Sequence, residues 1–266
     1  MRNRFFDFTT VTIAVLAGSS LLCTSAIFAQ NAPRAAPAAK STAPFDAHDL
    51  SGTWEKTRGT LLTMTNDPAP LNAEGLIKFN ASKPGYGPRM VPPALGNDPM
   101  GTCDPLGMPR SLFLEVSINR MQIAQLPNRM LQFFEWQHSW REVWTDGRAL
   151  PNDPDPRWMG YSVGKWDGDT FVINSLGFDG RTWLDHFGNP VSESMKLEER
   201  YHRADHDTLE LTMTITDPKY YSKPWVSTKR VMRLSTKDFD EVFCVPSEEQ
   251  AFNKGIRDPA GGKTGK

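Results

Sequence analysis

Short runs of alternating apolar and polar residues, separated by turns, fill the chain from residue 112 onward. Between residues 208 and 216, Leu209, Leu211, Met213 and Ile215 alternate with glutamate and threonine. Successive side chains of a β-strand point to opposite faces, so this pattern predicts a strand with one buried face and one face in water. Turn residues recur at intervals of about ten residues, which is typical of an antiparallel β-sandwich or barrel.

Several of these runs can be paired into hairpins from the turns between them. The runs at 119–126 and 129–136 are separated only by Pro127-Asn128, and the Asp-Gly-Asp segment at 167–169 is a strong turn signal between two further runs. About nine or ten strands follow one another without a long helix. Closure of such a meander removes the unpaired edges that invite aggregation. We therefore predict an all-β antiparallel meander that closes into a barrel.

A long connection rich in proline and glycine, residues 58–111, interrupts this pattern. It contains one candidate helical segment at 72–79, with Asn72 as its N-cap. A connection of this length inside a compact domain is usually functional unless an element has been missed. We interpret it as a lid over the barrel.

The two ends of the chain lack the pattern of a folded core. Residues 1–29 combine Arg2 and Arg4 with an apolar run that is too short for a permanent membrane span, which predicts a signal peptide cleaved after Ala26 or Ala29. Residues 30–44 form a flexible Ala/Pro linker, and residues 247–266 a short helix and a disordered tail. A single β-barrel domain is expected between them, at residues 45–246.

The export signal predicts a periplasmic or secreted protein with no integral membrane segment after cleavage. Cys23 can alternatively be a lipid-attachment site, although Leu22 before it is bulkier than that processing normally accepts. In an oxidising compartment the two remaining cysteines, Cys103 and Cys244, are expected to form a disulfide; two free buried thiols are the alternative. The formal net charge of −1 and the absence of a basic, aromatic-rich run exclude a nucleic-acid partner.

The segment Gly52-Thr53-Trp54 at the head of the meander resembles the Gly-x-Trp signature of lipocalins. The resemblance implies that Trp54 plugs the closed end of the barrel and that an arginine of the last strand, Arg230 or Arg233, lies across it. This chain departs from the family in its greater length, its long first connection and the lack of the second and third motifs.

A longer resemblance links the chain to uncharacterised exported bacterial proteins, which often look lipocalin-like. It is carried by residues 97–110, 135–148, 153–178 and 181–190. It implies no activity. Some members have histidines after the Gly-Asn-Pro turn, where this chain has other residues, so no metal site follows from it.

The aromatic segment 131–147 supplies the first candidate site. If the strand runs straight through Gln137 to Ser139, five side chains share one face, and we expect them to line a ligand cavity: Trp136, His138, Trp140, Glu142 and Trp144. Glu142, placed between two indoles, is a candidate general acid or an anchor for a polar ligand atom. The alternatives are a turn within the segment, core packing of the indoles, and a cross-strand Glu-Arg pair or an outward Glu142.

The loop 177–190 supplies the second candidate site. Arg181 and Trp183 are candidate ligand contacts, and His186 is a candidate acid/base group oriented by Asp185 or Asp179. The alternative is that Asp and Asn beside Gly simply build turns. Neither His202 with His206 nor the other Asp pairs fit a metal pattern, so we expect no metal and no cofactor.

These features favour an exported lipocalin-like protein that binds a small, partly apolar ligand in a Trp-rich barrel cavity. The alternatives are a periplasmic enzyme on the same barrel, an isomerase or hydrolase that uses Glu142 or His186, and a structural envelope protein. Whether the protein is an enzyme stays open, because one fold supports all three functions.

Overall fold

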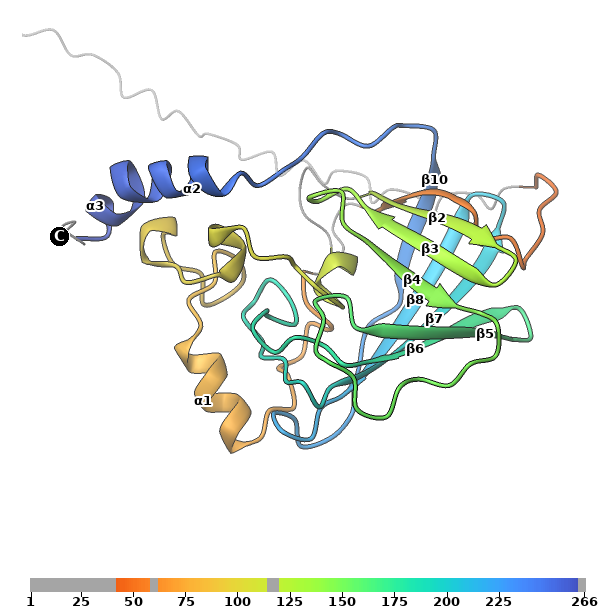
Figure 1. Ribbon diagram of the computed structural model, residues 1–266, viewed down its shortest axis with the longest axis horizontal. Helices are drawn as coiled ribbons and strands as arrows, with labels where there is room; N and C mark the ends of the chain where they lie inside the picture. The colour runs from red at the N-terminus through yellow and green to blue at the C-terminus, as the bar shows by residue number, and fades with distance from the viewer. Residues whose placement is uncertain (1–41, 58–61, 114–119, 263–266) are drawn as a thin grey trace, which may run out of the picture. The chain divides into compact units, whose positions relative to one another are not determined.

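The computed structural model describes residues 42–57, 62–113 and 120–262. The predicted signal peptide, most of the linker, and the last four residues of the tail lie outside this part of the chain. The described residues form a ten-stranded sheet that closes on itself because β10 pairs with both β1 and β8 (Figure 1). The prediction of an all-β meander that closes into a barrel with little helix is confirmed.

The barrel wall follows the order of the sequence. Its strands are β1 (Gly52–Lys56), β2 (Arg120–Leu126), β3 (Arg129–Phe134), β4 (Trp140–Trp144), β5 (Tyr161–Asp167), β6 (Thr170–Leu176), β7 (Lys196–Asp205), β8 (Thr208–Thr216) and β10 (Arg230–Ser235). A two-residue strand, β9 (Trp225–Val226), adds to β8. In β8, the alternation seen in the sequence places Leu209, Leu211, Met213 and Ile215 in the buried core.

One junction of the wall departs from an antiparallel meander. Strands β4 and β5 are parallel and share a single paired position, Trp144 with Val163. Parallel neighbours begin at the same end of a barrel, so the connection 145–160 must return along the wall between them. This connection and the short ladder leave the β4–β5 junction the least tightly paired part of the barrel.

Trp54 is fully buried at the end of the barrel where β1 begins, and its indole Nε1 donates to Leu50 O at 2.8 Å. The guanidinium of Arg203, on β7, lies over the indole at 5.4 Å. Gly52 has φ +134°, and an added Cβ there would lie 2.8 Å from Leu234 Cδ1. The backbone conformation and the close packing at this position therefore both favour glycine.

We expected the arginine that lies across Trp54 to come from the last strand, and this prediction is wrong. Arg230 lies instead over Phe113 at 4.4 Å, and Arg233 binds the Thr208 hydroxyl. Strand β7 supplies the cation because its end lies beside the start of β1, where Arg203 also donates to His206 O at 2.8 Å.

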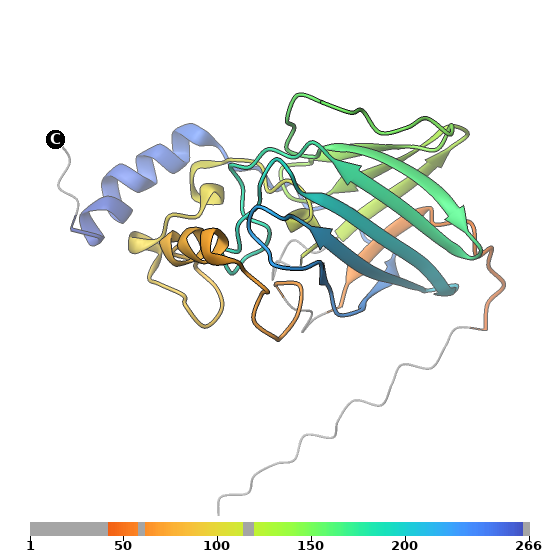
Figure 2. The same cartoon turned by 90° about the horizontal axis from the view of Figure 1, so that it is seen from below.

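The predicted lid segment holds α1 (Ala73–Ala81) and 3-10 turns at Pro93–Leu95, Pro99–Thr102 and Arg110–Leu112. They lie at the end of the barrel opposite Trp54, here called the lid end (Figure 1, Figure 2). Asn72 Oδ1 caps α1 by accepting from Gly75 N at 2.9 Å, as the sequence predicts. Gly75 also allows close packing, since an added Cβ would lie 2.1 Å from Tyr220 O.

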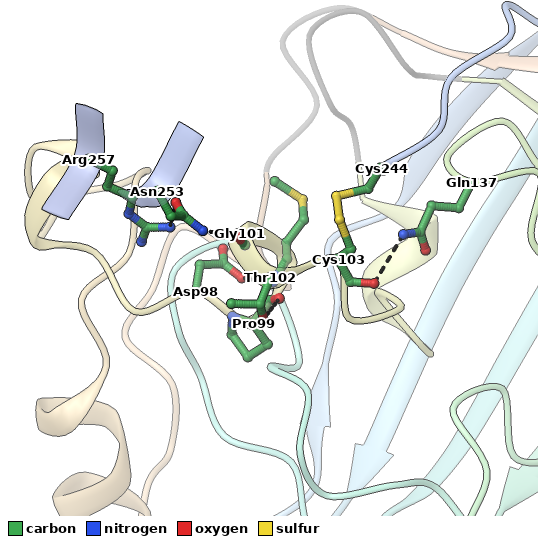
Figure 3. The surroundings of a disulfide bond; sticks show 10 residues. Asp98, Pro99, Gly101, Thr102, Cys103, Gln137, Cys244, Asn253 and Arg257 are labelled. Atoms are coloured by element: carbon green, nitrogen blue, oxygen red, sulfur yellow. Dashed lines mark hydrogen bonds between the residues drawn. A yellow bond between two sulfur atoms is a disulfide. The ribbon is translucent and has the colours of Figure 1, made fainter. Parts of the chain in front are cut away.

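The predicted disulfide between Cys103 and Cys244 is present and joins the lid segment to the end of the chain (Figure 3). Beyond it, helical turns run through α2 (Pro246–Phe252), a π-helical turn (Asn253–Arg257) and α3 (Asp258–Ala260). Arg257 donates to Pro93 O and to Gly96 O, both at 2.8 Å. The C-terminal helical segment is thus longer than the short helix that the sequence predicts. None of the helices in the described residues has the length and apolar character needed to span a membrane.

Candidate functional site

The expected inward face of the aromatic segment points outward in the structure. Arg141 and Val143 of β4 are buried, whereas Trp140 is 52% exposed and Glu142 and Trp144 are half-buried. The straight strand does not exist, because Gln137 and His138 turn the chain with φ angles of +54° and +45°. The prediction that these indoles face the barrel interior is therefore wrong, and the alternative of a turn at this point is correct.

Trp136 and His138 hold the end of the chain against the barrel. Trp136 forms an isolated bridge with Val242, and Gln137 N donates to Val242 O at 2.9 Å. The His138 ring stacks on Phe243 with ring centroids 4.7 Å apart. The His138 side chain thus contacts the segment that carries Cys244, whereas Trp136 is half-buried and lines a small pocket with Lys56 and Phe113.

Glu142 forms the cross-strand pair that was the alternative to a catalytic role. Its Oε1 lies 2.7 Å from Arg129 Nη1, on the outer face of the wall. The geometry therefore gives Glu142 no support as a general acid.

The loop 177–190 lies at the lid end, and only Gly180 and Arg181 in its first half are exposed. Arg181 binds both oxygens of Asp179 and lies over Trp158 at 4.5 Å. This hydrogen bond and the charge of Arg181 lower the pKa of Asp179 despite partial burial. Trp183 is half-buried and pairs with Pro190 in an isolated bridge, with the Arg110 guanidinium 5.5 Å from its ring.

Asp185 is fully buried and builds the turn that follows it. Its Oδ1 accepts from Phe187 N at 3.0 Å and from Asn189 N at 3.1 Å, while Oδ2 accepts from Asn189 Nδ2 at 2.6 Å and from the Thr63 hydroxyl. None of these bonds reaches the His186 ring. The predicted role of Asp185 in orienting His186 is wrong, and the alternative of a turn residue is correct.

His186 is also fully buried, beside a buried ion pair. Its Nδ1 lies 3.2 Å from Arg110 Nη2, and Arg110 binds both carboxylate oxygens of Asp98, at 2.8 and 2.6 Å. A guanidinium can only donate, so this contact assigns Nδ1 as the acceptor. Burial acts to raise the pKa of Asp98, but its hydrogen bond and attraction to Arg110 outweigh burial and lower the pKa. Asp98 and Arg110 are partners of His186 that the sequence did not indicate.

A cavity of about 430 Å³ lies at the lid end and is here called the lid cavity. Most of its lining is apolar, and the lining residues come from α1, the segments on either side of it, the loop 177–190 and β9. The apolar members include Ala69, Leu71, Leu76, Phe79, Tyr86, Pro88, Phe187 and Trp225, and the polar ones include Thr63, Arg89 and Asn189.

Two polar atoms of the lid cavity lining are buried and have no hydrogen-bond partner among the described residues: Asn189 Oδ1 and Arg89 Nε. Asn189 is 4% exposed, and its Nδ2 is committed to Asp185, which fixes the orientation of the amide. The other guanidinium nitrogens of Arg89 donate to Ser82 and to Phe187 O, and the group lies 3.5 Å over the Phe79 ring. Burial lowers the pKa of Arg89, and the charge of Asp185 offsets this only in part.

A buried acceptor and a buried donor without partners each carry a cost of about 1–3 kcal/mol. A site that keeps both, in an otherwise apolar cavity, is suited to a ligand that supplies the missing partners. Sequence reasoning placed a site in the loop 177–190 but missed Asn189, and in the lid segment it named only the helix cap Asn72 and the disulfide partner Cys103.

Searches of protein-family models, of curated proteins and of solved structures found no match to this chain. The resemblances to lipocalins and to exported bacterial proteins therefore stay predictions from the sequence. Among the described residues, no group of three or more histidine, cysteine or acidic side chains is arranged to hold a metal ion.

Proposed function

We propose that this protein is an exported, lipocalin-like binding protein that takes up a small, mostly apolar molecule in the lid cavity. The observation that carries the proposal is an apolar cavity whose lining includes two residues with an unpartnered buried polar atom, Asn189 Oδ1 and Arg89 Nε. The cavity volume falls within the range of small-molecule pockets, about 300–1,000 Å³.

The two atoms define the polar group of the ligand. Asn189 Oδ1 accepts a hydrogen bond and Arg89 Nε donates one, so the matching group is neutral and does both. A hydroxyl or a primary amide meets this requirement. The apolar lining from Leu71, Phe79 and Trp225 suits an alkyl or alicyclic body. The ligand class is thus a medium-chain alcohol or amide.

The position of the cavity in the barrel agrees with this function. Trp54 and Arg203 close one end, while the lid segment covers the other end and contributes much of the cavity lining. The Cys103–Cys244 disulfide and the Asn72 cap hold that segment in place. A cavity with preorganised walls binds more tightly than one whose walls must become ordered on binding.

Calorimetric titration with 1-decanol and decanamide tests the proposal, and decane, which lacks the polar group, is the chemical control. Leu76 lines the cavity, so Leu76→Trp should fill it and weaken binding by at least about tenfold. The matched control is Ile77→Trp, one residue along α1, where the side chain is 70% exposed and outside the lining. Absence of saturable binding by either probe, or equal weakening by both variants, would contradict the proposal.

The acid/base alternative has less support from the geometry. Glu142 is paired with Arg129 on the outer wall, and His186 has no exposed surface through which to reach a substrate. A structural envelope role becomes the better hypothesis if the lid cavity takes up neither probe.

A further inference from the structure

A second cavity, of about 480 Å³, lies on the outer wall where β4 and β5 share only one paired position. Its walls are the outward faces of these strands and the connection 145–160, and it is here called the β4–β5 groove. It contains the outward indoles of Trp140 and Trp144, the Tyr161 ring, and two arginines of the connection, Arg148 and Arg157.

Most charges in and around the groove are neutralised by a partner. Arg148 binds Asp146 at 2.6 Å, and Glu142 binds Arg129 at 2.7 Å. Arg141, at the floor, directs its guanidinium to Glu199 at 2.6 Å inside the barrel. These pairs contribute no net charge to the groove.

Arg157 is the exception. Its side chain is exposed and, among the described residues, makes no ion pair. The guanidinium lies 4.2 Å over the ring of Tyr161, which fixes its plane and leaves its N–H groups for a ligand. Among the residues that line the groove, Arg157 therefore contributes one unneutralised positive charge, while Asp153 and Asp155 of the same connection lie outside the lining.

The backbone of Arg157 is held firmly. Its N–H donates to Gly177 O at 2.9 Å, and its carbonyl accepts from Asp179 N at 2.9 Å. These bonds tie the connection 145–160 to the end of β6. The backbone that carries the Arg157 guanidinium is therefore already ordered before a ligand binds.

The aromatic rings of the groove differ in how much surface they offer. Arg148 lies over Trp144 at 3.6 Å, and Arg157 covers Tyr161. Trp140 is 52% exposed, and its only ring partner among the described residues is Phe133, with centroids 6.4 Å apart. An indole face is therefore open to a planar group in the same groove as the Arg157 guanidinium.

From this arrangement we propose that the β4–β5 groove is a second binding site, for a planar aromatic carboxylate. The carboxylate binds the guanidinium of Arg157 through two parallel N–H···O bonds, and the ring packs on Trp140. The site is independent of the lid cavity, whose lining shares no residue with the groove.

Titration with 2-naphthoate, monitored by calorimetry and by ligand-observed NMR, tests the proposal on the whole mature protein. The neutral isostere 2-naphthamide is the chemical control. We expect saturable binding of naphthoate that weakens at least about tenfold in Arg157→Gln, because a charge-assisted bidentate pair is lost. Binding should also weaken in Trp140→Ala and on raising the salt from about 20 mM to about 500 mM.

Two further variants test whether naphthoate binds at the β4–β5 groove rather than elsewhere on the protein. Arg200→Gln removes another exposed arginine, on β7, and should leave naphthoate binding unchanged. Leu76→Trp should also leave it unchanged, because that residue belongs to the lid cavity. Equal binding of naphthoate and naphthamide, unchanged affinity in a folded Arg157→Gln variant, or no saturable binding would each overturn the proposal.

Discussion

The side-chain amide of Asn189, a residue of the lid cavity lining, donates to Asp185 Oδ2 at 2.6 Å, which fixes the orientation of the amide and leaves its oxygen without a partner among the described residues. Asp185 in turn accepts from two backbone N–H groups and from the Thr63 hydroxyl. The residue expected to serve as a catalytic orienter thus orients Asn189, a residue of the lid cavity lining, instead.

Replacing Asp185 with asparagine should therefore affect both stability and binding. In Asp185→Asn, an NH2 group replaces one acceptor oxygen, so at least one buried donor that it served is left without a partner, at about 1–3 kcal/mol for each group. Denaturant unfolding measures the loss, and decanamide affinity should fall because Asn189 is no longer held. A variant with unchanged stability and unchanged affinity would show that the bond to Asn189 is not needed.

The ion pair of Asp98 with Arg110 should make the free energy of unfolding depend on pH in the acid range. Arg110 is fully buried, so Asp98→Asn leaves a buried charge uncompensated and should cost about 3–5 kcal/mol at neutral pH. Because the folded-state pKa of Asp98 lies below its ordinary value of 3.8, its contribution is present above that value and is lost as the pH falls through the folded-state pKa.

Unfolding free energies of the wild type and Asp98→Asn at about pH 7 and at about pH 3 measure this effect. The difference between the two proteins should shrink at the lower pH. The control is Asp167→Asn, which removes an exposed pair with Arg200 and should change stability little at either pH. A difference that stays constant with pH would mean that the titration of Asp98 is not linked to folding.

The disulfide should account for a large share of the stability. Cys103 and Cys244 are separated by 141 residues, and closing a loop of that length contributes about 4–5 kcal/mol in the chain-entropy model. The double variant Cys103→Ser/Cys244→Ser should lose this amount in denaturant unfolding, and reduction of the wild type should lower its midpoint to match. If reduction leaves the unfolding midpoint unchanged, the disulfide does not stabilise the protein by restricting the conformational freedom of the unfolded chain.

The elements that the sequence predicted best depend on local or pairwise rules. The alternation in 208–216 gives both the existence of β8 and its buried face, and Asn72 is recognisable as a helix cap. Cys103 and Cys244 can be paired because they are the two cysteines outside the predicted signal peptide. Each of these inferences needs either neighbouring residues or a count, and no knowledge of the packing.

The parts that were missed depend on distant contacts or unusual backbone geometry. The face of β4 was assigned wrongly because Gln137 and His138 adopt positive φ angles without the Gly or Asn that usually announces such a turn. Arg89 and Asn189 lie far apart in the sequence. They line the same cavity only because the lid segment and the loop 177–190 lie together at the lid end. No periodicity in the sequence links these two residues.

The packing of α1 against the β8–β9 connection supplies a last prediction, in which two effects of opposite sign compete. In Gly75→Ala, the helix propensity of alanine favours α1 by about 1 kcal/mol. The added Cβ would however lie 2.1 Å from Tyr220 O, a backbone atom held by the bond from Asn72 N at 2.9 Å. A backbone clash of this size cannot be relieved by a side-chain rotation, so α1 must shift. Since Leu76 and Phe79 of α1 line the lid cavity, we expect weaker decanol binding together with a lower melting temperature.

The control for Gly75→Ala is Glu74→Ala, on the exposed side of the same first turn, which should leave affinity unchanged. If Gly75→Ala instead raises the melting temperature and keeps full affinity, the close contact between α1 and Tyr220 is not a determinant of the cavity.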